Sequence, residues 1–381
     1  MREKTIIPYG RQYIDKSDIR AVTGILKSKW LTQGPMVDKF EKALCRYTGA
    51  KYAVAVSSGT AALHIACLSA GIKSGDEVIT SPITFVASAN CVLYCGGRPV
   101  FADIQRDTVN IDPEAIKKKL TKKTKALIPV HFAGHPCDLE EISRIAKDYN
   151  LIVIEDAAHA FGAQYKGSKI GSCKYSDMAI FSFHPVKHIT TGEGGAVLTN
   201  KKELYEKLLM FRSHGITKEK TRLINKNKGK WYYEMQTLGF NYRITDFQCA
   251  LGISQLKKID EFIKQRRDIA ENYDRKLSKL DEIILPKEKS YVKSSWHLYC
   301  IRLKNHLKRK SIFDKLIKSG IGVQVHYIPV HLQPYHRHKF GYGEGNFPVA
   351  ESYYDSCITL PLYPRMGLAQ NKVIDALRRL C

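Results

Sequence analysis

The sequence predicts an α/β fold, with a mostly parallel central sheet, helices on both faces of the sheet and a smaller C-terminal α+β domain. Two observations predict it. Between residues 52 and 200, short β-branched runs alternate with helical stretches, an order typical of parallel strands joined by right-handed crossovers. Beyond residue 214 that alternation ends, and a shorter mixture of strand and helix patterns follows.

The elements of the first region are predicted in chain order. Apolar, β-branched runs indicate strands at 52–56, 77–80, 99–101, 126–130, 151–154, 178–183 and 195–198. Between them, helical patterns cover 60–70, 85–95, a stretch opened by Asp112 and Pro113, and 138–150, for which Asp138 is the expected cap. The run 151–154 lacks polar alternation, so we expect both of its faces to be buried.

The second region begins with a basic, polar stretch at 217–230, which we expect to be a surface loop. A long helical pattern then covers about 245–280, with charges on one face. The C-terminal part indicates a strand at 297–303, a helix at 311–318, a strand at 322–327 and two closing helices. We therefore predict a large domain over 1–248, with an N-terminal arm, and a linking helix with a small domain over 249–381.

Composition restricts the partners. The chain of 381 residues has 61 Lys and Arg against 37 Asp and Glu, a formal net charge of +24, which favours anionic partners such as a phosphate-bearing substrate. The lysines are spread along the chain, which favours a solvated surface over a specific nucleic-acid interface. There is no apolar run long enough for a membrane span and no signal-like N-terminus, so we expect a cytoplasmic protein. The ten cysteines form no CxxC pair, and no metal site is expected.

Three segments carry candidate chemistry. In VSSGTAAL (56–63), Gly59 permits a tight turn before a helix, where free N–H groups of Thr60 and Ala61 could hold a phosphate. Asp156 ends an apolar strand, the edge at which α/β sheets bind ligands, with His159 as either a core or a catalytic residue. Lys187 follows aromatic residues and precedes a glycine-rich turn, where burial would lower its pKa and provide a free amine.

Together these residues suit pyridoxal phosphate. The helix N-terminus would hold the phosphate, Asp156 would keep the pyridine nitrogen protonated, and Lys187 would condense with the aldehyde and move a proton. Phe85 could stack on the ring, or pack in the core.

The chain resembles the DegT/DnrJ family of sugar aminotransferases, of the fold-type I pyridoxal-phosphate class. The resemblance covers nearly the whole chain and rests on SSGTAALHIACLSAGIKSGDEVITSPITFVASAN, VIEDAAHAFGA, FSFHPVKHITTGEGGAVLTN and LGFNYRITDFQCALGISQLKK. It implies a cofactor that alternates between pyridoxal and pyridoxamine phosphate, and a homodimer with its sites at the subunit interface. It also implies a set of cofactor residues: Lys187 and Asp156 with His159 close by, Thr60, Ala61 and Ser182 at the phosphate, Phe85 on the ring, Asn241 reaching the other subunit's phosphate, and Arg243 either orienting that loop or forming a structural ion pair.

Within the family, TTGEGG after the lysine is similar to enzymes that aminate carbon 4 of a nucleotide-linked keto sugar. The segments 29–34, 294–299 and 321–329 resemble the branch of the family that forms UDP-4-amino-4,6-dideoxy-N-acetyl-β-L-altrosamine for pseudaminic acid. In that branch the resemblance implies L-glutamate as the amino donor. That similarity implies a sugar-nucleotide site lined by Tyr9, Lys29, Trp30, Leu31, Thr32, Gly59, Val325, His326, Tyr327 and Ile328.

Alternatives stay open. The chain has SSGTAAL where that branch has NSATSAL, and His188 where it has proline, so another UDP-, GDP- or dTDP-linked 4-keto-6-deoxy sugar (perosamine or bacillosamine type) could be the substrate. A sugar dehydratase of the same fold would carry histidine in place of Lys187. A non-catalytic cofactor-binding regulator would not respond to glutamate, and a nucleic-acid binder would show salt-sensitive retention on DNA.

Overall fold

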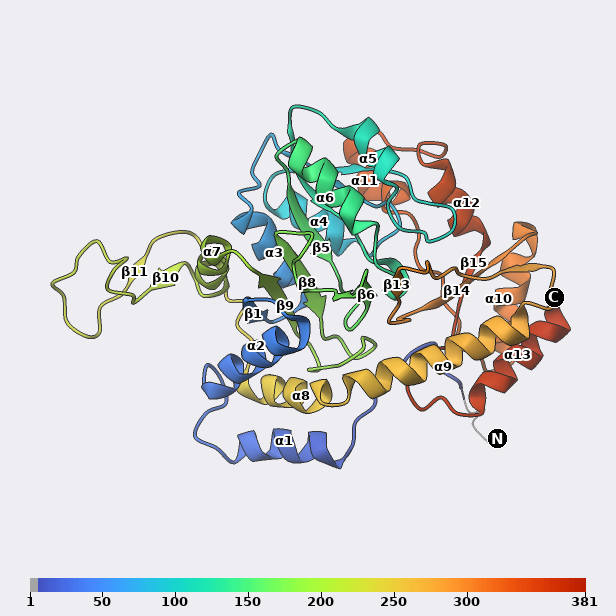
Figure 1. Ribbon diagram of the computed structural model, residues 1–381, viewed down its shortest axis with the longest axis horizontal. Coiled ribbons are helices and arrows are strands. Elements are labelled where there is room, and N and C mark those ends of the chain that lie inside the picture. Colours follow the sequence, from blue (N-terminus) through green and yellow to red (C-terminus); the bar gives the residue numbers. More distant parts are fainter. Residues whose placement is uncertain (1–5) are drawn as a thin grey trace.

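The computed structural model describes residues 6–381; residues 1–5, with which the predicted first domain begins, lie outside this range. At its centre is a seven-stranded sheet in the order β1-β9-β8-β5-β4-β2-β3 (Figure 1). Every neighbouring pair is parallel except those of β9, which is antiparallel to both β1 and β8. The prediction of a mostly parallel α/β sheet is confirmed. The strands are β1 (Tyr52–Val56), β2 (Glu77–Thr80), β3 (Arg98–Phe101), β4 (Thr124–Ile128), β5 (Ile152–Asp156), β8 (Met178–Ser182) and β9 (Gly195–Thr199).

Helices cover both faces of this sheet because successive side chains along each strand point to opposite faces. Ile154 and Ile180 pack against α3 (Gly59–Ser69), α4 (Ala87–Tyr94) and α7 (Lys202–Arg212). On the other face, Val153 packs against α5 (Pro113–Lys119) and α6 (Leu139–Asp148), and Phe181 packs near α2 (Pro35–Thr48) and α8 (Asp246–Leu256). Helix α1 (Lys16–Leu26) lies outside α8 (Figure 1).

A second core lies towards the C-terminus. Helix α9 (Ile259–Leu277) leads to an antiparallel sheet of β12 (Ile283–Ile284), β14 (Tyr299–Leu303) and β15 (Cys357–Leu360), which packs with α10 (Arg309–Lys318) and α13 (Ala369–Leu380). Helices α11 (Pro334–Phe340) and α12 (Pro348–Ser356) precede β15. Ile7 joins this core and pairs with Ile321, so the start of the described chain belongs in space to its C-terminal part.

Three short pairings complete the fold. Strand β6 (Gln164–Tyr165) pairs with β7 (Ser168–Lys169) on one side and with β13 (Val292–Lys293) on the other. Strands β10 (Ile216–Thr217) and β11 (Glu234–Met235) flank the basic loop, which projects from the body as an arm beyond α7 (Figure 1). Over residues 6–381, no helix combines the length and apolar character needed to cross a membrane.

Some sequence predictions are wrong in detail. The pattern at 245–280 forms two helices rather than one, because Lys258 N–H bonds back to the Gln255 carbonyl in a tight turn. The segment 322–327 forms no named strand: Gly322 bonds to Ile7, whereas Gln324 bonds to Thr359, so no continuous ladder develops. Two closing helices were expected, but three helices and β15 follow residue 330.

The predicted helix cap at Asp138 and the predicted domain boundary after residue 248 can also be compared with the structure. Asp138 precedes α6 without capping it, because its carboxylate accepts hydrogen bonds from the Gln105 amide and the Tyr291 hydroxyl instead. The domain boundary after residue 248 falls inside α8, and both Cys249 and Ile259 pack in the core of the large sheet. The division into two domains stays a prediction.

Candidate active site

Asp156 lies at the carboxyl end of β5 with its side chain buried. Its Oδ2 accepts a hydrogen bond from Ser88 Oγ at 2.6 Å, and its Oδ1 accepts one from the Ala158 N–H at 3.2 Å. The backbone of Asp156 pairs with the segment after β4, because the His131 N–H donates to the Asp156 carbonyl and the Asp156 N–H donates to the Pro129 carbonyl. A carboxylate is therefore held at the sheet edge where parallel α/β folds bind ligands.

Lys187 lies in the loop between β8 and β9, where its N–H donates to the His184 carbonyl. Burial lowers the pKa of its amine from 10.5 to about 8, while the negative charge of Asp156 acts in the opposite direction. The two groups are therefore close enough for their charges to interact. An amine with a pKa near 8 is unprotonated in a useful fraction of molecules at neutral pH, as a nucleophile requires.

His159 and Tyr327 meet beside these two charged groups. His159 Nε2 lies 3.1 Å from the Tyr327 hydroxyl, and the ring of His297 lies 4.4 Å from that of His159, centroid to centroid. Burial, followed by the positive charge of Lys187, holds the pKa of His159 well below 6.5. The histidine is therefore neutral near pH 7. It can form a hydrogen bond with the Tyr327 hydroxyl without adding a second positive charge to the site.

The predicted sugar residues near the C-terminal part join the same cluster. The rings of Tyr9 and His326 lie 5.6 Å apart, and His326 Nδ1 lies 2.9 Å from the Thr359 hydroxyl. Burial, and to a lesser degree Lys187, lower the pKa of His326 to about 4. Phe85, which is 59% exposed, faces Tyr327 with 6.4 Å between ring centroids. An aromatic side chain that is left uncovered and faces Tyr327 is suited to stack on a flat ligand.

The N-terminus of α3 offers an anion site, though not quite as predicted. Ser58 caps the helix and accepts the N–H of Ala61 at 3.1 Å, so the prediction of a free N–H at Ala61 is wrong in this structure. Among residues 6–381, the N–H of Thr60 has no acceptor. Gly59 lies so close to Ser182 that a β-carbon there would be 2.9 Å from the Ser182 Cβ. The helix N-terminus and a serine hydroxyl thus converge, as phosphate binding requires.

The remaining predicted residues lie elsewhere. Trp30 and Leu31 are about half exposed in a segment that pairs with Thr245, and no hydrogen bond or ring contact joins residues 29–32 to Lys187 in the described chain. Asn241 is exposed and pairs through its backbone with Ser213. Arg243 pairs with Val56. Val325 and Ile328 flank the His326–Tyr327 pair in sequence. The roles assigned to these and to the other site residues stay predictions.

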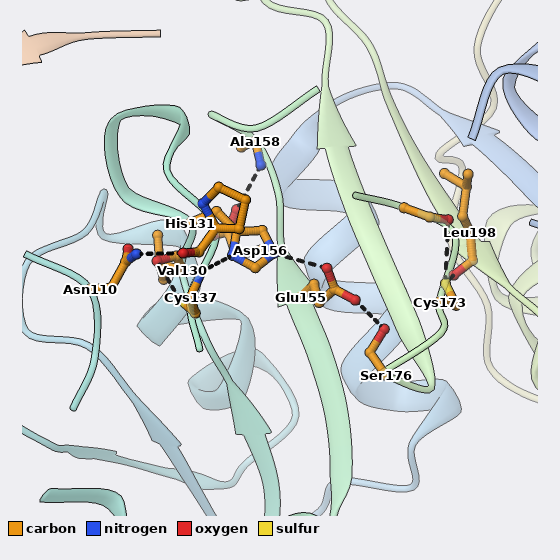
Figure 2. A network of polar contacts seen from close by, with 12 residues as sticks. Asn110, Val130, His131, Cys137, Glu155, Asp156, Ala158, Cys173, Ser176 and Leu198 are labelled. Carbon is orange, nitrogen blue, oxygen red and sulfur yellow. Dashed lines mark hydrogen bonds and ion pairs between the residues drawn. The ribbon is translucent and has the colours of Figure 1, made fainter. Parts of the chain in front are cut away.

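Sequence reasoning missed the polar residues behind the site. Glu155 points to the opposite face of β5 from Asp156, where its buried carboxylate bonds to His131 Nε2 at 2.9 Å and to the Ser176 hydroxyl (Figure 2). His131 Nδ1 accepts the N–H of Cys137, so Nε2 carries the proton that Glu155 accepts. Ser88 and His297 were missed as well. The four-residue spacing from Thr84 to Ser88 could have indicated Ser88, because on a helical turn it places the two hydroxyls on the same side, where they can form a hydrogen bond.

Comparisons with known proteins identify the family of the chain. Residues 12–378 match the DegT/DnrJ/EryC1/StrS aminotransferase family. The chain is 42% identical to the spore coat polysaccharide biosynthesis protein SpsC of Bacillus subtilis over 98% of this chain and 96% of that protein. It is 42% identical to the UDP-4-amino-4,6-dideoxy-N-acetyl-beta-L-altrosamine transaminase of Campylobacter jejuni, over 97% and 96% of the two chains.

Solved structures of lower sequence identity share the fold. Helicobacter pylori PseC, an aminotransferase involved in the biosynthesis of pseudaminic acid, superposes with a TM-score of 0.91 at 35% identity, over 98% of this chain and 99% of that one. The putative sugar aminotransferase Spr1654 of Streptococcus pneumoniae, solved in PLP and PMP forms, has a TM-score of 0.91 at 30% identity, over 98% of both chains.

Proposed function

The chain belongs to the DegT/DnrJ/EryC1/StrS aminotransferase family, and on that basis we propose that it transfers the amino group of L-glutamate to carbon 4 of a nucleotide-linked 4-keto-6-deoxy sugar. The proposed product is UDP-4-amino-4,6-dideoxy-N-acetyl-β-L-altrosamine. The Campylobacter jejuni and Helicobacter pylori relatives support this choice of sugar. The coarser conclusion is independent of the sugar: the protein is a sugar aminotransferase that uses pyridoxal 5′-phosphate.

One observation carries the proposal. An amine whose pKa burial lowers to about 8 lies within electrostatic reach of a carboxylate that ends a strand of the central sheet. Transamination needs this pair, because one group must condense with an aldehyde and move protons while the other stabilises positive charge on a pyridine nitrogen.

The residues present fit pyridoxal phosphate. Gly59 and Gly195 leave no room for side chains at the start of α3: a β-carbon at Gly195 would lie 2.5 Å from the Ser58 carbonyl oxygen. This tight packing places the first turn of α3 beside Ser182, where a phosphate would find N–H and hydroxyl donors. Asp156 keeps acceptor positions on both oxygens for a ring N–H, and Phe85 is uncovered for stacking.

When bound, the cofactor delocalises the electrons left at the carbon that loses its proton. The chain's own residues do the rest in this proposal. Lys187 would hold the cofactor through its amine, and that amine, with its lowered pKa, would take up and return a proton next to the substrate carbon. Asp156 holds the proton on the pyridine nitrogen. His159, neutral and bonded to Tyr327, fills the space beside them and excludes water. A positioned base of this kind contributes roughly 10²–10⁴-fold to the rate.

We also propose that the active enzyme is a homodimer in which Asn241 contacts the cofactor phosphate of the partner subunit. Asn241 is exposed in this chain and has no side-chain hydrogen bond among residues 6–381, which leaves its amide available to another subunit. The excess of basic side chains supports attraction of a diphosphate-linked sugar.

The decisive experiment is a substrate comparison. The purified enzyme is incubated with glutamate and each candidate 4-keto sugar nucleotide, linked to UDP, GDP or dTDP, and the products are identified by mass spectrometry and NMR. We expect the UDP-linked N-acetylated sugar to gain an amine at carbon 4, with 2-oxoglutarate formed in equal amount. Lys187→Ala serves as the inactive control. Preferred amination of a GDP- or dTDP-linked sugar would overturn the substrate, and amination at carbon 3 would overturn the position.

A further inference from the structure

A chain of three polar side chains ends on the catalytic carboxylate. Thr84 Oγ1 lies 2.6 Å from Ser88 Oγ, and Ser88 Oγ lies 2.6 Å from Asp156 Oδ2. All three side chains are buried, and Ser88 is 1% exposed. Thr84 follows β2, Ser88 lies in the first turn of α4, and Asp156 ends β5, so the chain connects three separate elements.

The direction of these hydrogen bonds follows from their chemistry. An ionised carboxylate can only accept, so the Ser88 hydroxyl donates to Asp156. Ser88 has a single proton to give, and therefore Thr84 donates to Ser88. A hydroxyl that accepts one hydrogen bond while donating another is polarised and donates more strongly.

These contacts restrain the one free torsion of the carboxylate. The terminal torsion of an aspartate side chain is soft, so the plane of the carboxylate is not set by its own rotamer preferences. Ser88 holds Oδ2 from α4, and the Ala158 N–H holds Oδ1 from the segment after β5. Each oxygen keeps one further acceptor position. The carboxylate is thus oriented before any ring N–H approaches it.

We propose that Ser88, supported by Thr84, is a positioning residue that orients Asp156 toward the pyridine nitrogen of the cofactor. The inference rests on the proposed function, because it assigns Asp156 to that nitrogen. The same turn carries Phe85, whose carbonyl accepts the N–H of Ser88 at 3.2 Å. The turn 84–88 therefore couples the residue expected on the ring face to the residue expected to orient the carboxylate at the ring nitrogen.

The test combines Ser88→Ala with two readouts other than turnover. In Ser88→Ala we expect the Kd of the apoenzyme for pyridoxal phosphate to rise about 10-fold. With ¹⁵N-labelled cofactor, the pyridine nitrogen should lose its protonated chemical shift at a lower pH than in the wild type. We expect kcat to fall about 10-fold, with the KM for the sugar nucleotide within about twofold of wild type because the sugar contacts are untouched.

Two further variants separate positioning from packing. Thr84→Val keeps the shape but removes the proton donated to Ser88, so it should shift the same readouts by a smaller factor. The double variant should be no worse than Ser88→Ala, since Thr84 acts through Ser88. Ser69→Ala is the matched control: Ser69 is also 1% exposed, and its hydroxyl has no partner in the described chain, so all readouts should match wild type.

The outcomes distinguish the two proposals. A wild-type enzyme whose cofactor spectrum does not respond to glutamate contradicts the proposed function itself. A wild-type enzyme that responds, together with a Ser88→Ala variant whose Kd and ¹⁵N shift are unchanged, contradicts the positioning role alone. If Ser88→Ala does not fold, Thr84→Val decides through its ¹⁵N shift, which is expected to move; an unchanged shift overturns the inference.

Discussion

Lys187 differs from the surface lysines of this basic chain in the state of its amine. The other lysines for which a shift is found, Lys117 and Lys166, bond to glutamates at the surface and have raised pKa values, whereas burial lowers the pKa of Lys187 to about 8. A lysine with the ordinary pKa of 10.5 has roughly 0.3% of its amine unprotonated at pH 8, and Lys187 has about half. The burial of the Lys187 amine causes this difference in its protonation.

The first prediction concerns pH. The rate at which apoenzyme binds pyridoxal phosphate should rise with pH and reach half its maximum at about pH 8, because only the unprotonated Lys187 amine reacts. Rapid mixing followed by absorbance gives the rate, and borohydride trapping with peptide mass spectrometry identifies the attached lysine. In Asp156→Asn the midpoint should move to lower pH, since the charge of Asp156 raises the pKa of Lys187. A midpoint near pH 10 would contradict the burial argument.

The second prediction concerns Asp156 itself. Asp156→Asn should weaken cofactor binding and slow turnover roughly 10- to 100-fold, from about 1.5–3 kcal/mol for a hydrogen bond to a charged group. An amide cannot supply the negative charge that keeps a pyridine nitrogen protonated. Cofactor affinity and kcat measure the effect, with Asp38→Asn on the exposed face of α2 as the control. Normal turnover in Asp156→Asn would defeat the electron-sink role.

At the scale of elements, one helix is capped by a residue far away in sequence. Helix α2 has Gly34 at its N-cap position and therefore no side chain of its own to accept the first N–H groups. Asp246, at the start of α8, accepts the N–H of Gly34 at 2.6 Å and that of Met36 at 2.8 Å. The negative charge of this buried carboxylate also interacts favourably with the positive end of the α2 dipole. The backbone N–H of Asp246 also donates to the Leu31 carbonyl, so this residue holds both the predicted sugar-binding segment 29–32 and the residues that follow it.

The third prediction tests that anchor. Asp246→Ala should lower the free energy of unfolding by about 2–3 kcal/mol, because two N–H groups lose a charged acceptor. It should also raise the KM for the sugar nucleotide more than it lowers kcat. Thermal or urea unfolding measures the first effect and steady-state kinetics the second.

The matched control is Asp38→Ala, which removes an exposed ion pair with Lys42 on α2 and should cost less than about 1 kcal/mol. Equal stabilities for the two variants would show that Asp246 does not cap the helix.

At the scale of the whole molecule, the arm beyond α7 and the segment around residue 30 leave large apolar side chains exposed. On and beside the arm these include Trp231 and Leu238, both more than two-thirds exposed, and Trp30 is 56% exposed. Large apolar side chains that stay in contact with water are stabilised when a partner surface buries them. These side chains are candidates for the contact between subunits in the proposed homodimer.

The fourth prediction is subunit complementation. Lys187→Ala and Asn241→Ala should each be inactive or nearly so when expressed alone. If Asn241 acts across the interface, coexpressed subunits form mixed dimers with one intact site, and random assembly should restore about a quarter of wild-type activity. Activity of differently tagged mixed dimers checks this. A fully active Asn241→Ala variant, or mixed dimers without activity, would contradict a site shared between subunits.

Much of the fold was predictable from residue patterns because local periodicity reports burial. The seven strands of the large sheet were expected close to their observed positions, since apolar β-branched runs between turns have few other stable arrangements. Asp156 and Lys187 were recognisable from the sequence because each follows an apolar strand. Burying a carboxylate or an amine there costs free energy unless a partner or a ligand compensates for it. By contrast, β15 and the break between α8 and α9 were missed, because tertiary pairing decides them.

The amino-acid sequence alone was therefore enough to indicate the central sheet, and to indicate Asp156 and Lys187 as the two charged residues that follow its strands. Packing in three dimensions was needed to bring Ser88 to Asp156, Tyr327 to His159 and Asp246 to α2, pairs separated by 68 or more residues. No short-range pattern encodes such contacts, since each depends on where separate strands and helices come to rest against one another. The same burial sets the pKa of Lys187, which depends on the water that neighbouring elements exclude.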